Sequence, residues 1–140
     1  MPHLTMDYSS NLGTLDVPHI LGALNSAIAA SGQVADPLDL KGRANRHEVY
    51  QIGTPDVDPA AHGFVHVSLA LLAGRAPDAK KAISARLMSV LQEQAYPAAL
   101  RVQFSVEIRD MERETYSKAF RAAQDLSLIH ISEPTRRYAI

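Results

Sequence analysis

The spacing of apolar side chains predicts a strand and then a helix in the first part of the chain. Residues 2–8 alternate between apolar and polar side chains, which is the two-residue period of a strand. From Val17 onward the apolar residues recur every three or four positions, as on the buried face of a helix. Asp16 can cap this helix and Gly32 can end it, so the pattern indicates an amphipathic helix packed on a sheet.

The same order of elements returns in the second part of the chain. Residues 41–52 are interpreted as an extended segment, and the proline-containing stretch 53–63 as a loop. The almost continuous apolar run 64–72 predicts a central strand that is buried on both faces. Pro77 opens a second amphipathic helix, and the alternation over residues 100–109 is typical of a half-exposed strand. The repeated order strand, helix, strand indicates a tandem βαβ duplication.

Composition narrows the kinds of function that such a fold can serve. The 140 residues suffice for one domain, and 46% hydrophobic with 21% charged residues is the balance of a soluble globular protein. A formal net charge of −1 does not indicate a nucleic-acid partner. The absence of cysteine excludes a thiol nucleophile and thiolate zinc sites. The first residues lack the pattern of a signal peptide or membrane span, so we expect a cytoplasmic protein with no membrane partner.

The last residues of the sequence are considered apart from the domain. Residues 126–136 resemble the translation of a transposon-end adapter used in preparing sequencing libraries. We therefore expect one domain over residues 1–125 and give residues 126–140 no part in the fold. The alternative is a genuine strand around residues 128–131, which the apolar pattern alone permits.

Removal of residues 126–140 should leave folding unchanged, because selection did not shape an adapter-derived segment to pack on this core. A chain truncated after Asp125 is expected to keep the melting temperature and the size-exclusion volume of the full chain. A large fall in melting temperature, or loss of an oligomer that the full chain forms, would show that the segment is part of the structure.

The start of the chain carries the sharpest candidate for chemistry. A small second residue, Pro2, permits removal of Met1, and Pro2 then becomes a terminal secondary amine. Terminal α-amino groups titrate near about 7.7–8.0, so modest desolvation makes such an amine a general base at neutral pH. Many proteins begin with Met-Pro without any catalytic use, and this start alone does not indicate an enzyme.

Three segments together carry a resemblance to a known family. They are Pro2-His3-Leu4 at the start, Phe64-Val65-His66-Val67-Ser68-Leu69, and the Ala73-Gly74-Arg75 turn that follows. With the βαβ duplication, they resemble the tautomerase superfamily, and within it the 5-carboxymethyl-2-hydroxymuconate isomerases, from Pro2 to about Tyr116. The resemblance implies an α+β, tautomerase-like tandem βαβ fold: a four-stranded mixed sheet with two helices on one face, assembled as a homotrimer.

The resemblance also implies a reaction and its residues. Pro2 would be the general base of a cofactor-free, metal-free isomerase that moves a proton between the enol oxygen and a carbon of an unsaturated 2-hydroxy or 2-oxo di- or tricarboxylate. Such a reaction belongs to the catabolism of aromatic compounds. Arg75 would bind a substrate carboxylate. Lys41 and Arg43 lie in a segment where the family usually carries two arginines, and lysine lacks the bidentate fork of arginine.

Other interpretations remain beside this one. A non-catalytic trimeric binding protein could keep the same scaffold, and a relative could use the same proline for hydration or decarboxylation. Arg75 could be a solvated residue at the start of a helix. His62 and His66 lie at the entry of a strand, where a metal site is not favoured, and Asp56 and Asp58 are expected to shape a loop.

Overall fold

The computed structural model describes residues 1–124 and confirms the predicted order of elements. Three short 3₁₀ helices, η1 (Ser10–Leu12), η2 (Pro37–Asp39) and η3 (Pro59–Ala61), lie in the connections. Residues 125–140, which include the adapter-like segment, lie outside the described residues, so the domain boundary stays a prediction. The strands and helices are β1 (His3–Ser9), α1 (Val17–Ala30), β2 (Lys41–His47), β3 (His62–Leu72), α2 (Pro77–Gln92) and β4 (Arg101–Met111).

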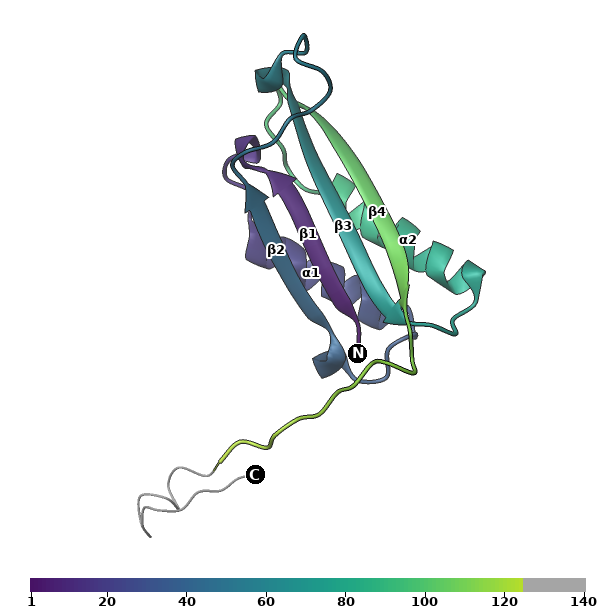
Figure 1. The fold of residues 1–140 in the computed structure, drawn as a ribbon. Helices are drawn as coiled ribbons and strands as arrows, with labels where there is room; N and C mark the ends of the chain where they lie inside the picture. The colour runs from purple at the N-terminus through teal and green to yellow at the C-terminus, as the bar shows by residue number, and fades with distance from the viewer. Residues whose placement is uncertain (125–140) are drawn as a thin grey trace, which may run out of the picture.

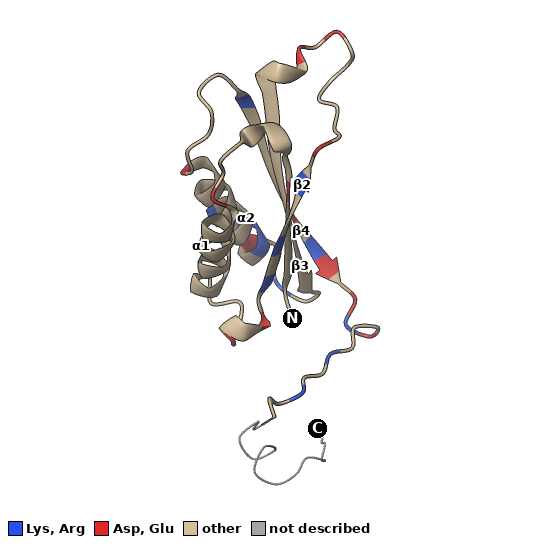
Figure 2. Ribbon diagram, turned by 90° about the vertical axis from the view of Figure 1, so that its left-hand side faces the viewer, with Lys and Arg blue, Asp and Glu red and all other residues tan. Residues whose placement is uncertain are grey.

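The strands form one mixed sheet in the order β2-β1-β3-β4. Strands β1 and β2 pair in parallel, as do β3 and β4, while β1 and β3 meet antiparallel at the centre. Each parallel pair is joined through a helix, and both helices cover the same face of the sheet (Figures 1 and 2). The predicted α+β architecture of two βαβ units is therefore confirmed. Within residues 1–124, neither helix is long and apolar enough to cross a membrane.

The core lies between the sheet and the two helices. The strands supply every second residue, and the helices supply residues at intervals of three or four positions, as their periods require. Full burial of one such side chain stabilises the fold by roughly 1.5–3 kcal/mol. The fully buried core side chains include Leu4 and Met6 of β1, Ile20, Leu24 and Ile28 of α1, Val65, Val67, Leu69 and Leu71 of β3, and Ile83, Leu87 and Leu91 of α2.

Two details of the second part of the chain differ from the sequence prediction. The extended segment predicted over 41–52 forms a strand only to His47, because its partner β1 ends at Ser9, opposite His47, and leaves the next residues without a strand to pair with. Strand β3 is central, but within the described part of the chain, residues 1–124, only one of its faces is buried. Its outward residues, such as Phe64 and Leu72, stay partly exposed because both helices pack on the other face.

Gly63 is expected to tolerate no larger residue, because a Cβ atom there would lie 2.9 Å from Cδ2 of Leu12 and 3.2 Å from Oγ of Ser9. Gly63→Ala should lower the free energy of unfolding by about 1–3 kcal/mol through overpacking. Gly22 of α1 has open space where a Cβ atom would lie, so Gly22→Ala should raise the free energy of unfolding by about 0.5–1 kcal/mol. Urea unfolding of both variants checks this pair. Equal urea midpoints for Gly63→Ala and Gly22→Ala would contradict the close packing at Gly63.

Candidate active site

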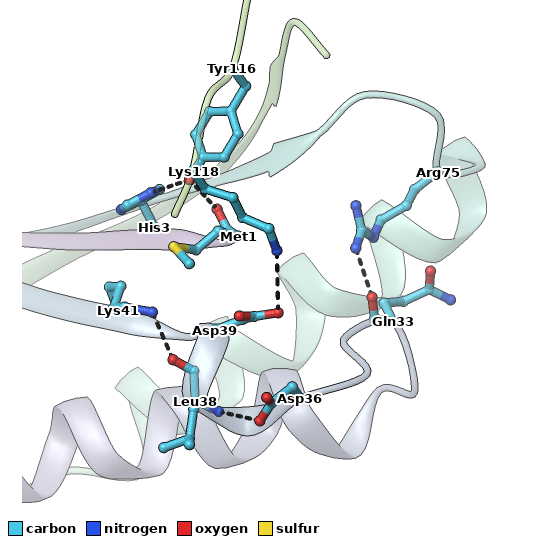
Figure 3. A network of polar contacts seen from close by, with 10 residues as sticks. All are labelled: Met1, His3, Gln33, Asp36, Leu38, Asp39, Lys41, Arg75, Tyr116 and Lys118. Carbon is cyan, nitrogen blue, oxygen red and sulfur yellow. Dashed lines mark hydrogen bonds and ion pairs between the residues drawn. The ribbon is translucent and has the colours of Figure 1, made fainter. Parts of the chain in front are cut away.

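The amino end of the chain enters the sheet at its centre, where β1 lies between β2 and β3. Pro2 is buried just before β1, and its carbonyl oxygen accepts a hydrogen bond from the backbone N–H of Lys41 at 3.2 Å. This bond holds the first residues against β2. A pocket of about 570 Å³ opens beside them (Figure 3) and is lined by Met1, Asp36, Leu38, Asp39, Lys41, Lys118, Ala119 and Phe120.

Positive side chains gather around the terminal amine. Burial lowers the pKa of the Met1 amine below its usual value, the positive charges of Lys118, Arg75 and Lys41 lower it further, and Asp39 acts in the opposite direction. Each cation disfavours the protonated amine by like-charge repulsion. An amine at this end of the sheet is therefore biased toward its neutral, basic form.

Arg75 lies outside the pocket lining, near enough to Met1 to lower the pKa of its amine, and it joins the end of β3 to the segment after α1 (Figure 3). Its Nη1 donates to the carbonyl oxygen of Leu72 at 3.0 Å, and its Nη2 donates to that of Gln33 at 2.7 Å. Its Nε is buried and has no hydrogen-bond partner among residues 1–124. Arg75 therefore ties these two backbone segments together, and the two bonds use two of the five N–H donors of its guanidinium.

The structure separates the two other predicted binding residues. Lys41 lines the pocket, and its Nζ donates to the carbonyl oxygen of Leu38 at 2.7 Å. Arg43 is exposed two residues further along β2, opposite Thr5, and its Nη2 lies 3.1 Å from Nδ1 of His3. Of the four predicted site residues, Lys41 lines the pocket, whereas Pro2, Arg43 and Arg75 lie outside its lining.

The sequence analysis did not single out several residues of this region. Lys118 and Tyr116 come from the segment after β4, which has no apolar period and so gave no signal. The Nζ atom of Lys118 lies 4.0 Å from Oδ2 of Asp39, and the hydroxyl oxygen of Tyr116 lies 2.9 Å from Nε2 of His3. Asp39 could have been noticed, because it opens the segment that contains Lys41 and Arg43.

The remaining candidates have local partners. His66 lies on the outer sheet face, with Nδ1 2.6 Å from Oγ of Ser105 and Nε2 3.2 Å from Oε1 of Glu107. The Asp58 carboxylate accepts from the backbone N–H of Ala60, and the Thr54 hydroxyl donates to Asp56 and lowers the pKa of that carboxyl. No group of three or more potential ligands in residues 1–124 is placed to hold a metal ion.

Solved structures share the fold of this chain. A wild-type symmetric trimer of a fused 4-OT has a TM-score of 0.59 with 21% identity, over 84% of this chain and 91% of that chain. FG41 malonate semialdehyde decarboxylase has a TM-score of 0.60 with 16% identity, over 94% of this chain and 98% of that chain. At these identities the likeness shows the fold alone.

The family follows from the sequence. Residues 2–124 match the family model of 5-carboxymethyl-2-hydroxymuconate isomerase, so the chain belongs to that family and is an isomerase. A 5-carboxymethyl-2-hydroxymuconate isomerase from Deinococcus radiodurans R1 is 27% identical, with a TM-score of 0.74, over 84% of this chain and 88% of that chain. No curated protein matches the chain.

Proposed function

We propose that this isomerase is a cofactor-free tautomerase of an unsaturated 2-hydroxy or 2-oxo di- or tricarboxylate, such as 5-carboxymethyl-2-hydroxymuconate, with Pro2 as its base. The family match and the pocket at the amino end of the chain both support this substrate class. We place the reaction in the breakdown of an aromatic acid in the cytoplasm.

The proposed proton transfer has two steps. After removal of Met1, the neutral Pro2 amine takes the proton of the enol hydroxyl, so that an O–H bond breaks and an N–H bond forms. The resulting dienolate spreads its negative charge along the conjugated chain. The Pro2 ammonium then gives the same proton to a carbon, which restores the neutral amine and leaves the 2-oxo product.

The observation that carries this proposal is the set of charges around the amino end of the chain. Burial first, and then Lys118, Arg75 and Lys41, lower the pKa of the Met1 amine against the opposite effect of Asp39, and we expect the same bias for the Pro2 amine that replaces it. Of these cations, Lys41 and Lys118 line the pocket and are suited to bind carboxylates. In this scheme Arg75 and Lys41 contact substrate directly, and Arg43 acts from the neighbouring sheet face.

A homotrimer is part of the proposal. Within residues 1–124, the sheet leaves the outer edges of β2 and β4 unpaired, and unpaired edges favour association with further strands. The outer face of the central strand β3 also carries partly exposed apolar residues, which association of subunits would cover. The trimers of the fused 4-OT structures agree with this arrangement.

The pH dependence of turnover tests the proposed base. Because the amine must be neutral, kcat/KM for ketonisation should rise with pH and level off above the pKa of Pro2, and the midpoint should lie below the usual value of about 8 for a terminal amine. Absorbance of the conjugated enol follows the reaction, and mass spectrometry of the same sample identifies the first residue. A flat profile would contradict the proposal, and full activity with Met1 retained would rule out the Pro2 amine. An inactive protein that binds carboxylates would instead be the binding protein considered above.

A further inference from the structure

A chain of hydrogen bonds outside the pocket leads to the first peptide bond. The Nη2 atom of Arg43 lies 3.1 Å from Nδ1 of His3, and Nε2 of His3 lies 2.9 Å from the hydroxyl oxygen of Tyr116. That hydroxyl lies 3.4 Å from the carbonyl oxygen of Met1 (Figure 3). The three side chains come from β2, β1 and the segment after β4, so the fold brings them together from distant parts of the sequence.

The donor and the acceptor of each of these hydrogen bonds follow from the chemistry of the groups. Arginine has no acceptor, so Arg43 donates and Nδ1 of His3 accepts. A neutral imidazole that accepts at Nδ1 carries its hydrogen on Nε2, and His3 therefore donates to the oxygen of Tyr116. Burial and the charges of Arg43, the terminal amine and Lys41 lower the pKa of His3, which favours this neutral ring. The Tyr116 hydroxyl is left to donate toward the start of the chain.

The Met1 carbonyl oxygen marks where a substrate oxygen would lie in the mature enzyme. It is bonded to the same carbon as the nitrogen of Pro2, so it lies directly beside the atom that becomes the amine. An enol oxygen must also lie within hydrogen-bond reach of that nitrogen for its proton to move. After Met1 is removed, the Tyr116 hydroxyl faces the space in which this oxygen is required.

We propose that Tyr116 is a further catalytic residue, whose hydroxyl donates a hydrogen bond to the substrate oxygen that becomes negative when Pro2 takes the enol proton. His3 and Arg43 are positioning residues that aim this hydroxyl. Tyr116 keeps its own proton throughout, so the proton balance of the reaction is unchanged. The inference rests on the proposed function and adds an oxyanion donor to it.

Tyr116→Phe tests the donor, because it removes the hydroxyl and keeps the ring. Since loss of one oxyanion donor costs about 100-fold, kcat for the enol carboxylate should fall roughly 100-fold, with KM changed less than about threefold. The matched control is Tyr96→Phe. Tyr96 is also half-buried and its hydroxyl donates to the carbonyl oxygen of Leu91 at 2.6 Å, far from the amine, so this variant should lose stability and keep wild-type kinetics.

A double-mutant cycle tests the positioning residue His3. His3→Ala should lower kcat in the wild-type enzyme and have little further effect in the Tyr116→Phe enzyme, because both changes remove the same donor. His3→Gln keeps a side-chain N–H donor of similar reach and should recover part of the rate. His19→Ala, at an exposed position of α1, is the control and should have wild-type kinetics.

The ring of His3 gives a readout that a purely structural role would not change. Nitrogen NMR of the mature enzyme should find the hydrogen of His3 on Nε2. In Arg43→Met, which removes the donor to Nδ1, the hydrogen should distribute between both nitrogens and kcat should fall. A hydrogen on Nδ1 in the unmodified protein would overturn the directed chain.

The outcomes separate this inference from the proposed function. A lower kcat in both Pro2→Ala and Tyr116→Phe supports the proposed proline base and the role of Tyr116. Loss in Pro2→Ala with wild-type kcat in Tyr116→Phe overturns the role of Tyr116 and leaves the proline mechanism intact. Loss in Tyr116→Phe with wild-type kcat in Pro2→Ala overturns the proposed base and keeps the oxyanion donor. A Tyr116→Phe enzyme altered in KM alone would make Tyr116 a binding group and overturn the inference.

Discussion

Pro2→Ala should lower kcat for ketonisation by about 100-fold or more, since a positioned general base contributes about 10²–10⁴-fold. Alanine also permits removal of Met1, so the variant keeps a terminal amine, but that amine is primary and free to rotate. Its pKa and its direction toward the enol oxygen both change. Far-ultraviolet circular dichroism should match the unmodified protein, because the backbone carbonyl of residue 2 still pairs with the N–H of Lys41.

Two controls make the result on Pro2 specific. Pro18→Ala changes an exposed proline in the first turn of α1 and should leave kcat unchanged. Protein that retains Met1 has an amide nitrogen at Pro2, which cannot act as a base, and it should be as slow as the variant. If Pro2→Ala turned over enol substrate at the rate of the unmodified enzyme, the proline mechanism would be wrong.

Arg75→Ala should lower kcat/KM at least about tenfold, since a charge-assisted hydrogen bond to a carboxylate is worth about 1.5–3 kcal/mol. The same change should lower the melting temperature, because the carbonyl groups of Leu72 and Gln33 both lose a donor. Steady-state kinetics below the melting transition separate the two effects. An increase in KM would report lost ground-state binding, and a decrease in kcat would report a contact that strengthens toward the dienolate.

Arg75→Lys and Arg86→Ala complete this experiment. Lysine keeps the charge but loses the fork, so it should recover part of the binding and little of the bridge between the two loops. Arg86 is an exposed arginine of α2, and its removal should change neither stability nor kinetics. If Arg75→Ala lowered only the melting temperature, Arg75 would be a structural tie without a part in binding.

The elements of the fold were predictable because each has a local period. Residues such as Leu4 and Met6 alternate with polar neighbours, and Ile20, Leu24 and Ile28 follow a helical spacing. The predictions for β2 and β3 were wrong where the pairing of strands and the packing of the helices decided the structure. Strand β2 ends at His47 because β1 offers no further partner, and one face of β3 stays uncovered because both helices lie on the other face. No local sequence pattern predicts either of these two features.

The sequence offered candidate site residues where a motif carried them, and their roles stay predictions. The start at Pro2 and the turn at Arg75 could be named from the sequence, and the structure places Arg75 close enough to affect the terminal amine. The segment with Lys41 and Arg43 was also found, but not its geometry. These two side chains point to different surroundings, Lys41 to the pocket and Arg43 to His3.

By itself, the sequence determined the order of the six main elements, the buried face of each helix and the family, because periodicity and motifs are properties of neighbouring residues. Only the tertiary structure decided what surrounds the terminal amine. Lys118 and Tyr116 reach the start of the chain because β4 lies beside β3 and the segment after it returns past β1 (Figure 1). Contacts between residues more than 100 positions apart depend on how the whole sheet is assembled, so no local pattern encodes them.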